Sequence, residues 1–167
     1  IGDFVERRDM LPELMAVESW DAGSGDIFFD AESYDAASKT WVREVEPPRS
    51  AKPSAQEAHK AFSAVLGVSQ DKQTGYVTVS IEHQSPIVAA QWVNWLVEDV
   101  NAAVKAQDVA EAEKSIEYLR EQVTNTSLAD LQAVFFDLIQ SQTETVMLAE
   151  VRQEYVFKTI DPAVAPE

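Results

Sequence analysis

Apolar residues recur at helical spacing through most of the second half of the chain. No proline or glycine interrupts the sequence between Pro86 and Pro162. The pair Ser85-Pro86 is typical of a helix start, because serine caps the first turn and proline is tolerated at the first helical position. The pattern therefore predicts a helix from Pro86 to about Thr124, which would be about 58 Å long.

Two apolar stripes are expected along this helix. In the second stripe, apolar residues alternate steps of three and four positions, which is the spacing of a seam between packed helices. A small domain does not bury a helix of this length, so we expect it to project from the globular part. The first stripe consists of Ala89, Val93, Leu96, Val100 and Ala103, and the second of Val109, Ala112, Ile116, Leu119 and Val123.

A break at Asn125-Thr126-Ser127 separates this helix from a second predicted helix that ends near Val151. Ser127 and Asp130 have the spacing of a capping box. The two helices either fold back as an antiparallel hairpin or continue as one kinked rod. We expect the hairpin, because a predicted strand follows and has to return to the sheet. The positions expected to face the first helix are Leu128, Leu131, Phe135, Leu138, Gln142 and Val146.

Strand signals occur on both sides of the helical block. Residues 68–82 contain two short runs around a turn at 71–75, and the second run alternates apolar and polar side chains. This pattern predicts an antiparallel hairpin in which Gly75 supplies a positive φ. Tyr155–Ile160 reads as a single strand, which Asp161-Pro162 ends because proline has no amide hydrogen to donate.

The signals before residue 68 are shorter. A short helix interrupted at Pro12 is expected within residues 4–15, and residues 27–29 are expected to form a buried anchor or an edge strand at most. Ser54 and Glu57 form a capping box for a helix that continues through Leu66. The remainder of residues 1–53 is expected to be irregular.

Together these elements predict an α+β fold in a single domain, residues 1–167. We expect residues 1–84 and 152–167 to form a small α/β base. Residues 85–151 are expected to form a long helical extension that protrudes from this base.

Composition excludes several classes of function. Apolar residues make up 46% of the chain, and 29 acidic against 13 basic residues give a formal net charge of −16. Such a charge argues against binding to nucleic acid. The chain has no cysteine, so it has no disulfide and no thiolate chemistry. No apolar run approaches the roughly 20 residues of a membrane span. Because the chain begins with Ile1-Gly2, we interpret it as an excised fragment, so the absence of targeting and membrane segments here says little about the parent protein.

The residue types used in catalysis and metal binding are not arranged for either role. His59 and His83 are isolated from each other and from carboxylate pairs, so surface or capping roles are expected. Acidic side chains on the long helix are expected to be solvated, and Asp21–Asp26 to be a plain turn rather than a calcium loop. Trp92 and Trp95 are expected in the core rather than as a sugar-stacking platform. We therefore expect no enzyme activity, no cofactor and no metal ion.

Three segments carry a resemblance to a known family. They are the helix entry Thr78-Val-Ser-Ile-Glu-His-Gln-Ser-Pro86-Ile-Val-Ala89, the stretch Ala90-Gln-Trp-Val-Asn-Trp-Leu-Val97, and the exit Tyr155-Val-Phe-Lys-Thr-Ile-Asp-Pro-Ala-Val164. In element order and in these segments the chain resembles the periplasmic domain of Wzz-type chain-length determinants, the polysaccharide co-polymerases. The helical section is shorter than in many members of that family.

The resemblance implies an inner-membrane protein with one membrane helix before Ile1 and another after Glu167. The base would then be membrane-proximal and the domain periplasmic. Family members form homo-oligomeric rings and set the chain length of lipopolysaccharide O-antigen, acting on a polysaccharide polymerase or on the growing glycan. Candidate residues for the oligomer interface are Ile116, Leu119, Phe135 and Phe136.

Two other functions are open from the sequence. One is a helical-hairpin adaptor that binds another protein and has no link to polysaccharide. The other is a glycan-acting enzyme that uses paired carboxylates among the acidic residues of the long helix.

Overall fold

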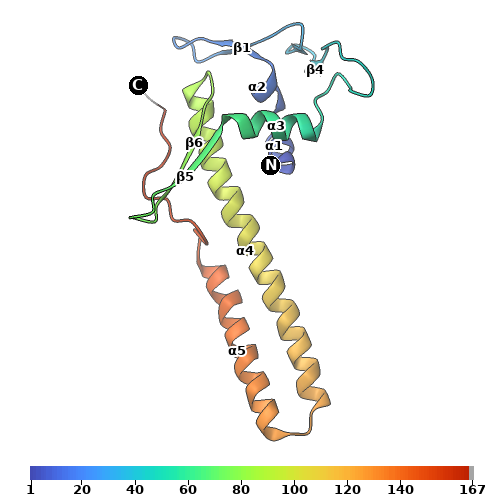
Figure 1. Ribbon diagram of the computed structural model, residues 1–167, viewed down its shortest axis with the longest axis vertical. Helices are drawn as coiled ribbons and strands as arrows, with labels where there is room; N and C mark the ends of the chain where they lie inside the picture. Colours follow the sequence, from blue (N-terminus) through green and yellow to red (C-terminus); the bar gives the residue numbers. More distant parts are fainter. Residues whose placement is uncertain (166–167) are drawn as a thin grey trace. The chain divides into compact units, whose positions relative to one another are not determined.

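The computed structural model describes residues 1–165 (Figure 1). It combines helices with small antiparallel sheets, which confirms the predicted mixture of helix and strand. The chain forms two compact units, one of Ile1–Leu96 with residues 163–165 and one of Val97–Pro162. The division falls inside the longest helix, α4 (Pro86–Asn125), and not at residue 85. Residues 152–162, expected in the base, belong to the second unit.

The first unit begins with two short helices, α1 (Gly2–Arg7) and α2 (Leu11–Met15). Asp9 lies between them with a positive φ of 51°. The helical segment is therefore interrupted before α2, and the predicted interruption at Pro12 is wrong. Pro12 lies in the first turn of α2, where its missing amide hydrogen removes no intrahelical hydrogen bond.

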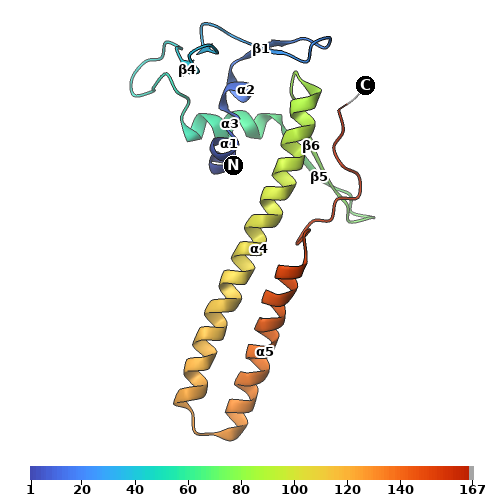
Figure 2. The ribbon, with the colours of Figure 1, turned by 180° about the vertical axis from the view of Figure 1, so that it is seen from behind.

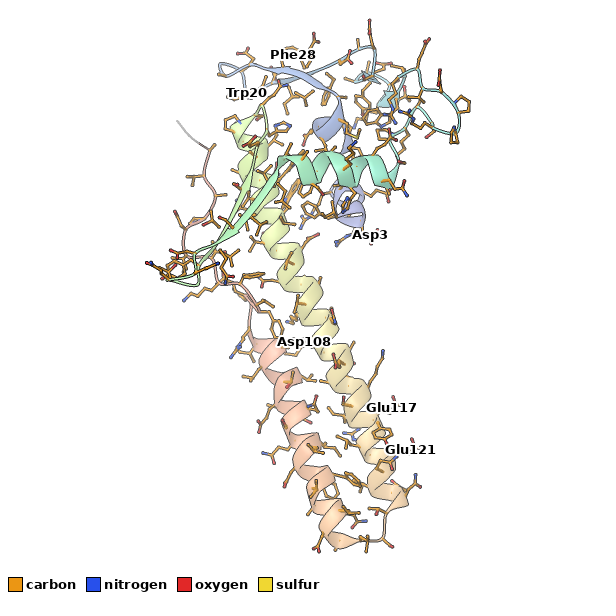
Figure 3. All side chains as sticks on the ribbon, in the orientation of Figure 1. Asp3, Trp20, Phe28, Asp108, Glu117 and Glu121 are labelled. Carbon is orange, nitrogen blue, oxygen red and sulfur yellow. The ribbon has the colours of Figure 1, made fainter. Side chains whose placement is uncertain are left out.

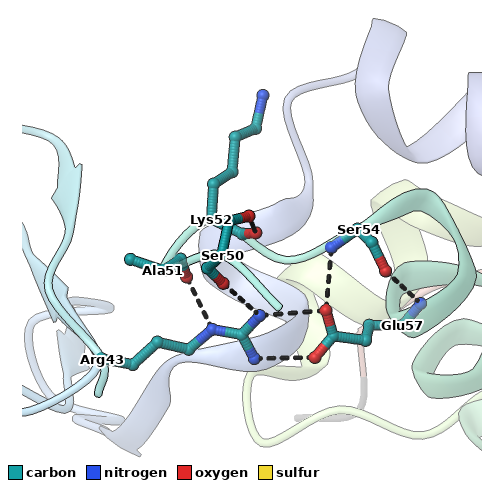
Figure 4. A network of polar contacts seen from close by, with 6 residues as sticks. All are labelled: Arg43, Ser50, Ala51, Lys52, Ser54 and Glu57. Carbon is teal, nitrogen blue, oxygen red and sulfur yellow. Dashed lines mark hydrogen bonds and ion pairs between the residues drawn. The ribbon is translucent and has the colours of Figure 1, made fainter. Parts of the chain in front are cut away.

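Helix α3 (Ala55–Val65) has the predicted capping box. The Ser54 hydroxyl accepts a hydrogen bond from the Glu57 amide, and the Glu57 carboxylate accepts one from the Ser54 amide. Arg43 adds a bidentate ion pair to the same carboxylate, with both N···O distances at 3.0 Å (Figure 4). The Arg43 guanidinium also donates to the carbonyl oxygens of Ser50 and Ala51, so it fixes the segment that leads into α3.

Three two-stranded antiparallel sheets occur in the described part of the chain. The pairs are β1 (Val17–Trp20) with β2 (Ile27–Phe29), β3 (Tyr34–Asp35) with β4 (Thr40–Trp41), and β5 (Leu66–Gln70) with β6 (Val77–Ile81). The β5–β6 hairpin confirms the prediction for residues 68–82, and Gly75 has a φ of 76°. Residues 17–41 are more regular than predicted, because aspartate side chains organise their turns.

The turns within residues 21–38 repeat one pattern, Asp-Ala-x-Ser. In each turn the aspartate carboxylate accepts hydrogen bonds from the amide two residues on and from the serine hydroxyl three residues on. These hydrogen bonds favour the charged carboxylate and lower the pKa of each aspartate. The aspartates are Asp21, Asp30 and Asp35, and the donors with the largest effect on them are Gly23, Ser33 and Ser38, respectively.

The core of the first unit is a cluster around Trp92, whose side chain is fully buried. The Trp92 ring lies 6.1 Å from the Phe62 ring and 5.0 Å from the His83 ring, measured between centroids. Trp95 packs against this cluster, with the Arg8 guanidinium 5.0 Å from its ring centroid. Both tryptophans are therefore core residues, as predicted. The buried members of the cluster are Phe4, Val5, Met10, Leu11, Ala58, Phe62, Val88 and Trp92.

His83 organises the start of α4. Its Nε2 donates to the carbonyl oxygen of Glu13 at 2.9 Å, and its Nδ1 accepts from the Ser85 amide at 3.0 Å. The Ser85 hydroxyl in turn accepts from the Val88 amide at 3.4 Å, which confirms the predicted helix start. His59 is exposed on α3. The predicted roles are therefore confirmed: His83 takes part in capping the start of α4, and His59 lies on the surface.

The second unit is an antiparallel hairpin of the α4 segment from Val97 onward and α5 (Ala129–Val151), as predicted (Figures 1 and 2). The side-chain amide of Gln132 donates to the carbonyl oxygens of Val123 and Thr126, at 3.3 and 2.9 Å. The N-cap of α5 is Leu128, which makes no side-chain cap. The predicted cap by Ser127 is therefore wrong, and Gln132 holds the interhelical connection instead.

The predicted strand at Tyr155–Ile160 is also wrong. Residues 152–165 contain no helix or strand. The backbone amides of Val156 and Phe157 bond to the side chain of Asn101 on α4, and not to a neighbouring strand. Residues 152–162 therefore pack within the hairpin unit.

Candidate interaction surface

The two helices of the hairpin pack through a seam, which we define as the α4 and α5 side chains that are buried or half-buried in the second unit. Ala112 and Ala149 are its most buried residues, at 2% and 0% exposure. Every member of the second predicted stripe on α4 is buried or half-buried, which confirms that stripe. The larger apolar residues of the seam are only half-buried.

The seam of α5 differs from the predicted one. Phe135, Gln142 and Val146 lie in it as expected, but Leu131 and Leu138 are 44% and 45% exposed. Leu128, which precedes α5, is 61% exposed. The other seam positions of the helix are Gln132, Ile139, Thr143, Thr145 and Ala149. The helix is therefore rotated relative to the prediction.

The four predicted interface residues occupy two different environments. Ile116, Leu119 and Phe135 are half-buried in the seam, where they hold the hairpin together. Phe136 is 56% exposed and lies outside the seam. Among these four residues, Phe136 is thus the one with most of its side chain available to a partner.

Helix α5 exposes an unusual amount of apolar surface. Its sequence has no lysine or arginine, and its charged residues are all acidic. The exposed large apolar side chains fall into two groups along the helix, one within residues 131–138 and one within residues 147–151. Neighbouring exposed apolar side chains are candidates for contact with another molecule. The exposed large apolar residues of α5 are Leu131, Val134, Phe136, Leu138, Met147, Leu148 and Val151.

Two open grooves run between α4 and α5, one on each flank of the seam. The first has a volume of about 460 Å³ and is bordered by Tyr118, which is 61% exposed. The second has a volume of about 530 Å³ and carries more charge. The first is lined by Glu111, Lys114, Ser115, Tyr118, Leu119, Leu138 and Gln142, and the second by Glu113, Ile116, Glu117, Arg120, Thr143 and Val146.

Acidic residues are exposed along α4 in this unit. Glu121 is exposed, and Glu117 is exposed at the border of the second groove (Figure 3). The pKa of Tyr155 is raised, chiefly because its hydroxyl donates a hydrogen bond to the Asp108 carboxylate and also because it is partly desolvated. Asp108 thus contacts the segment after α5.

Asn101 is a buried polar residue of the hairpin, at 7% exposure. Its Oδ1 accepts hydrogen bonds from the amides of Val156 and Phe157, both at 2.9 Å. Its Nδ2 donates to the Phe157 carbonyl oxygen at 3.0 Å. We call these three hydrogen bonds the Asn101 contact. The sequence offered one signal for it, an amide side chain directly after Val100 in a predicted apolar stripe.

The described residues form neither a metal-binding cluster nor a helix that could cross a membrane. Within residues 1–165, no group of three or more His, Asp or Glu side chains is placed to hold a metal ion. In the same range no helix has both the length and the apolar content that crossing a bilayer requires. Comparison of the chain with models of protein families, with curated proteins and with solved structures found no match.

Proposed function

We propose that this protein is a non-enzymatic regulator of lipopolysaccharide O-antigen chain length, or of the chain length of a related surface polysaccharide. It would act as a homo-oligomer that scaffolds the polysaccharide polymerase or the growing glycan. The proposal places the domain in the periplasm, with the base near an inner membrane that helices outside this sequence would cross. It rests on the resemblance of three sequence segments to Wzz-type determinants.

The structural observation that best supports a scaffold is the apolar exterior of α5. A hairpin that needed no partner would be expected to place charged residues on most of its outer face. Here seven large apolar side chains of one helix remain exposed, including Phe136 and Leu148. Assembly with other protomers would remove this surface from water, at roughly 25 cal/mol per Å² of apolar area.

The test of the function is a gel of lipopolysaccharide from cells in which the parent gene is deleted and then restored. We expect deletion to change a clustered O-antigen ladder into a random, short-weighted one, and restoration to bring the cluster back. A ladder that is indifferent to the gene would refute this function. The helical-hairpin adaptor would then be the next reading to examine.

The interface part of the proposal is best tested at Phe136, because charging a seam residue would also damage the hairpin. We expect Phe136→Lys to weaken assembly and to shift the polysaccharide length distribution while helix content stays unchanged. Gln107→Lys is the matched control, since it adds the same charge at an exposed position of α4. Equal assembly of the two variants, measured by sedimentation velocity on the full-length protein, would exclude Phe136 from the interface.

A further inference from the structure

We infer that the Asn101 contact is a positioning device, which fixes the path of the chain after α5 against α4. Helix α5 ends at Val151, and the following residue is already extended, with a ψ of 123°. From there to Pro162 the backbone has no ladder partner among the described residues. The direction of this segment is therefore set by side-chain contacts, of which the Asn101 contact has the most hydrogen bonds.

The chemistry of the contact is specific to an amide. Val156 and Phe157 present two N–H donors to one oxygen, and Phe157 presents a carbonyl acceptor to the neighbouring nitrogen. Among uncharged side chains of this length, only asparagine offers an acceptor and a donor side by side in one plane. Because Asn101 is buried, an unmatched polar atom at this position would be costly.

A second contact on the same face of α4 supports this path. Tyr155 donates to Asp108, two turns of α4 away from Asn101. Closer along the chain, the Glu154 carboxylate accepts from the Thr159 amide at 2.9 Å. Two residues of one helix therefore hold three consecutive residues of the segment, from Tyr155 to Phe157.

The consequence for function rests on the function proposed above. If the chain after Pro162 leads to a second membrane anchor, the Asn101 contact joins that anchor to the long hairpin. A change in the hairpin would then be transmitted to the anchor through α4. We therefore expect polysaccharide length control to require the contact, although Asn101 touches neither glycan nor polymerase in this scheme.

The first test is hydrogen exchange of the Val156 and Phe157 amides in full-length protein. Asn101→Ala should increase their exchange by at least about tenfold, since it removes three hydrogen bonds of ordinary net strength. Amides of the α4 seam, such as that of Leu119, should exchange as in the unmodified protein. Gln107→Ala, which removes an exposed amide from the same helix, is the control and should change neither set. Unchanged exchange at Val156 and Phe157, or loss of protection throughout the hairpin, would overturn the inference.

The variant Asn101→Asp allows the contact to be opened and closed by pH in the same protein. At neutral pH the second carboxylate oxygen would face the Phe157 carbonyl, so the contact should open. At about pH 4 or below, a protonated carboxyl group can donate to that carbonyl and still accept from both amides. Protection of Val156 and Phe157 should therefore rise about tenfold as the pH falls, whereas the unmodified protein should show no such rise. A purely packing role would give no pH dependence, and that result would refute the inference.

The cellular test uses the same variants and separates the two proposals. Asn101→Ala should disperse the polysaccharide length distribution, and Gln107→Ala should not. If Asn101→Ala opens the contact but leaves the distribution unchanged, the link from the contact to length control is refuted while the proposed function stands. If deletion of the parent gene has no effect on the distribution, the proposed function itself fails.

Discussion

At the scale of single residues, the strongest electrostatic feature is the pairing of Arg43 with Glu57. The pKa of Glu57 is lowered from 4.5 to about 2. The largest cause is the hydrogen bonding from the Arg43 side chain, and the second largest is the hydrogen bond from the Ser54 amide. Both side chains are only partly buried, at 18% and 25% exposure. The carboxylate serves the capping box and the ion pair at once, so its protonation would weaken both.

This pairing predicts a pH dependence of stability. The folded pKa of Glu57 lies below its unfolded value, so the stabilisation is fully present above about pH 4.5 and is lost as the pH falls toward 2. Arg43→Met should flatten the decline of the unfolding free energy over this range, as measured by urea denaturation at several pH values. Identical slopes for the variant and the unmodified protein would contradict the assignment.

The two histidines make a matched pair for a second prediction. His83 makes hydrogen bonds to Glu13 and Ser85 and its ring packs at a tilt of 57° against Trp92, whereas His59 is exposed. His83→Ala should lower the free energy of unfolding by about 1–3 kcal/mol, because it leaves polar groups of the backbone unsatisfied. His59→Ala should change it by less than about 0.5 kcal/mol. Urea denaturation of both variants checks this, and equal effects would refute the capping role.

At the scale of elements, α5 is the helix whose orientation is least obvious from its sequence. Leu138 and Ile139 are adjacent, but the structure places Ile139 in the seam and leaves Leu138 45% exposed. Ile139→Ala should therefore cost about 1–3 kcal/mol of stability, whereas Leu138→Ala should cost less than about 1 kcal/mol. The reverse order in thermal or urea unfolding would support the seam that the heptad spacing predicts.

The elements that could be predicted from the sequence are those with local signals. The Ser54–Glu57 capping box, the Ser85-Pro86 helix start and the turn at Gly75 each depend on residues within a few positions of one another. The seam of α5 could not be predicted, because apolar residues surround most of the helix and periodicity then selects no single face. The segment after α5 was predicted as a strand from its composition, but its amides bond to Asn101, more than fifty residues earlier.

The same contrast applies to the candidate interface. Ile116, Leu119 and Phe135 could be recognised as apolar and regularly spaced, but spacing does not distinguish the inside of a hairpin from the surface between protomers. Phe136 breaks the spacing and is the exposed residue. Asn101 was absent from the predictions because a single amide next to an apolar stripe does not identify the backbone groups that it binds.

At the scale of the whole molecule, net charge opposes the self-association that we propose. The formal charge of −16 makes protomers repel one another, and α5 contributes acidic residues without basic partners. Salt screens such repulsion between exposed charges, with a Debye length that falls from about 30 Å at 0.01 M to about 3 Å at 1 M. Apolar contact is not weakened in the same way.

We therefore predict that association strengthens with ionic strength. Sedimentation velocity at a fixed protein concentration should show larger species as NaCl is raised from about 0.01 M to about 0.5 M. Phe136→Lys should reduce this effect, because it removes apolar contact area at the proposed interface. Dissociation on addition of salt would instead indicate that ion pairs, and not apolar contacts, join the protomers.

The Asp-Ala-x-Ser turns have a consequence for how this chain can vary between related proteins. The carboxylate of each aspartate finds its donors within four residues. The backbone of the Asp30 turn is also held from outside, because the Asp30 amide donates to the Ala16 carbonyl oxygen and the Ser33 carbonyl oxygen accepts from the Val42 amide. The side-chain hydrogen bonds of one turn are therefore independent of those of the others, whereas Ile27 and Trp41, which flank the turns, pack against the Trp92 cluster. When related sequences are aligned, the aspartate and serine of each turn should persist while the third residue of each turn, here Gly23, Glu32 or Ala37, varies.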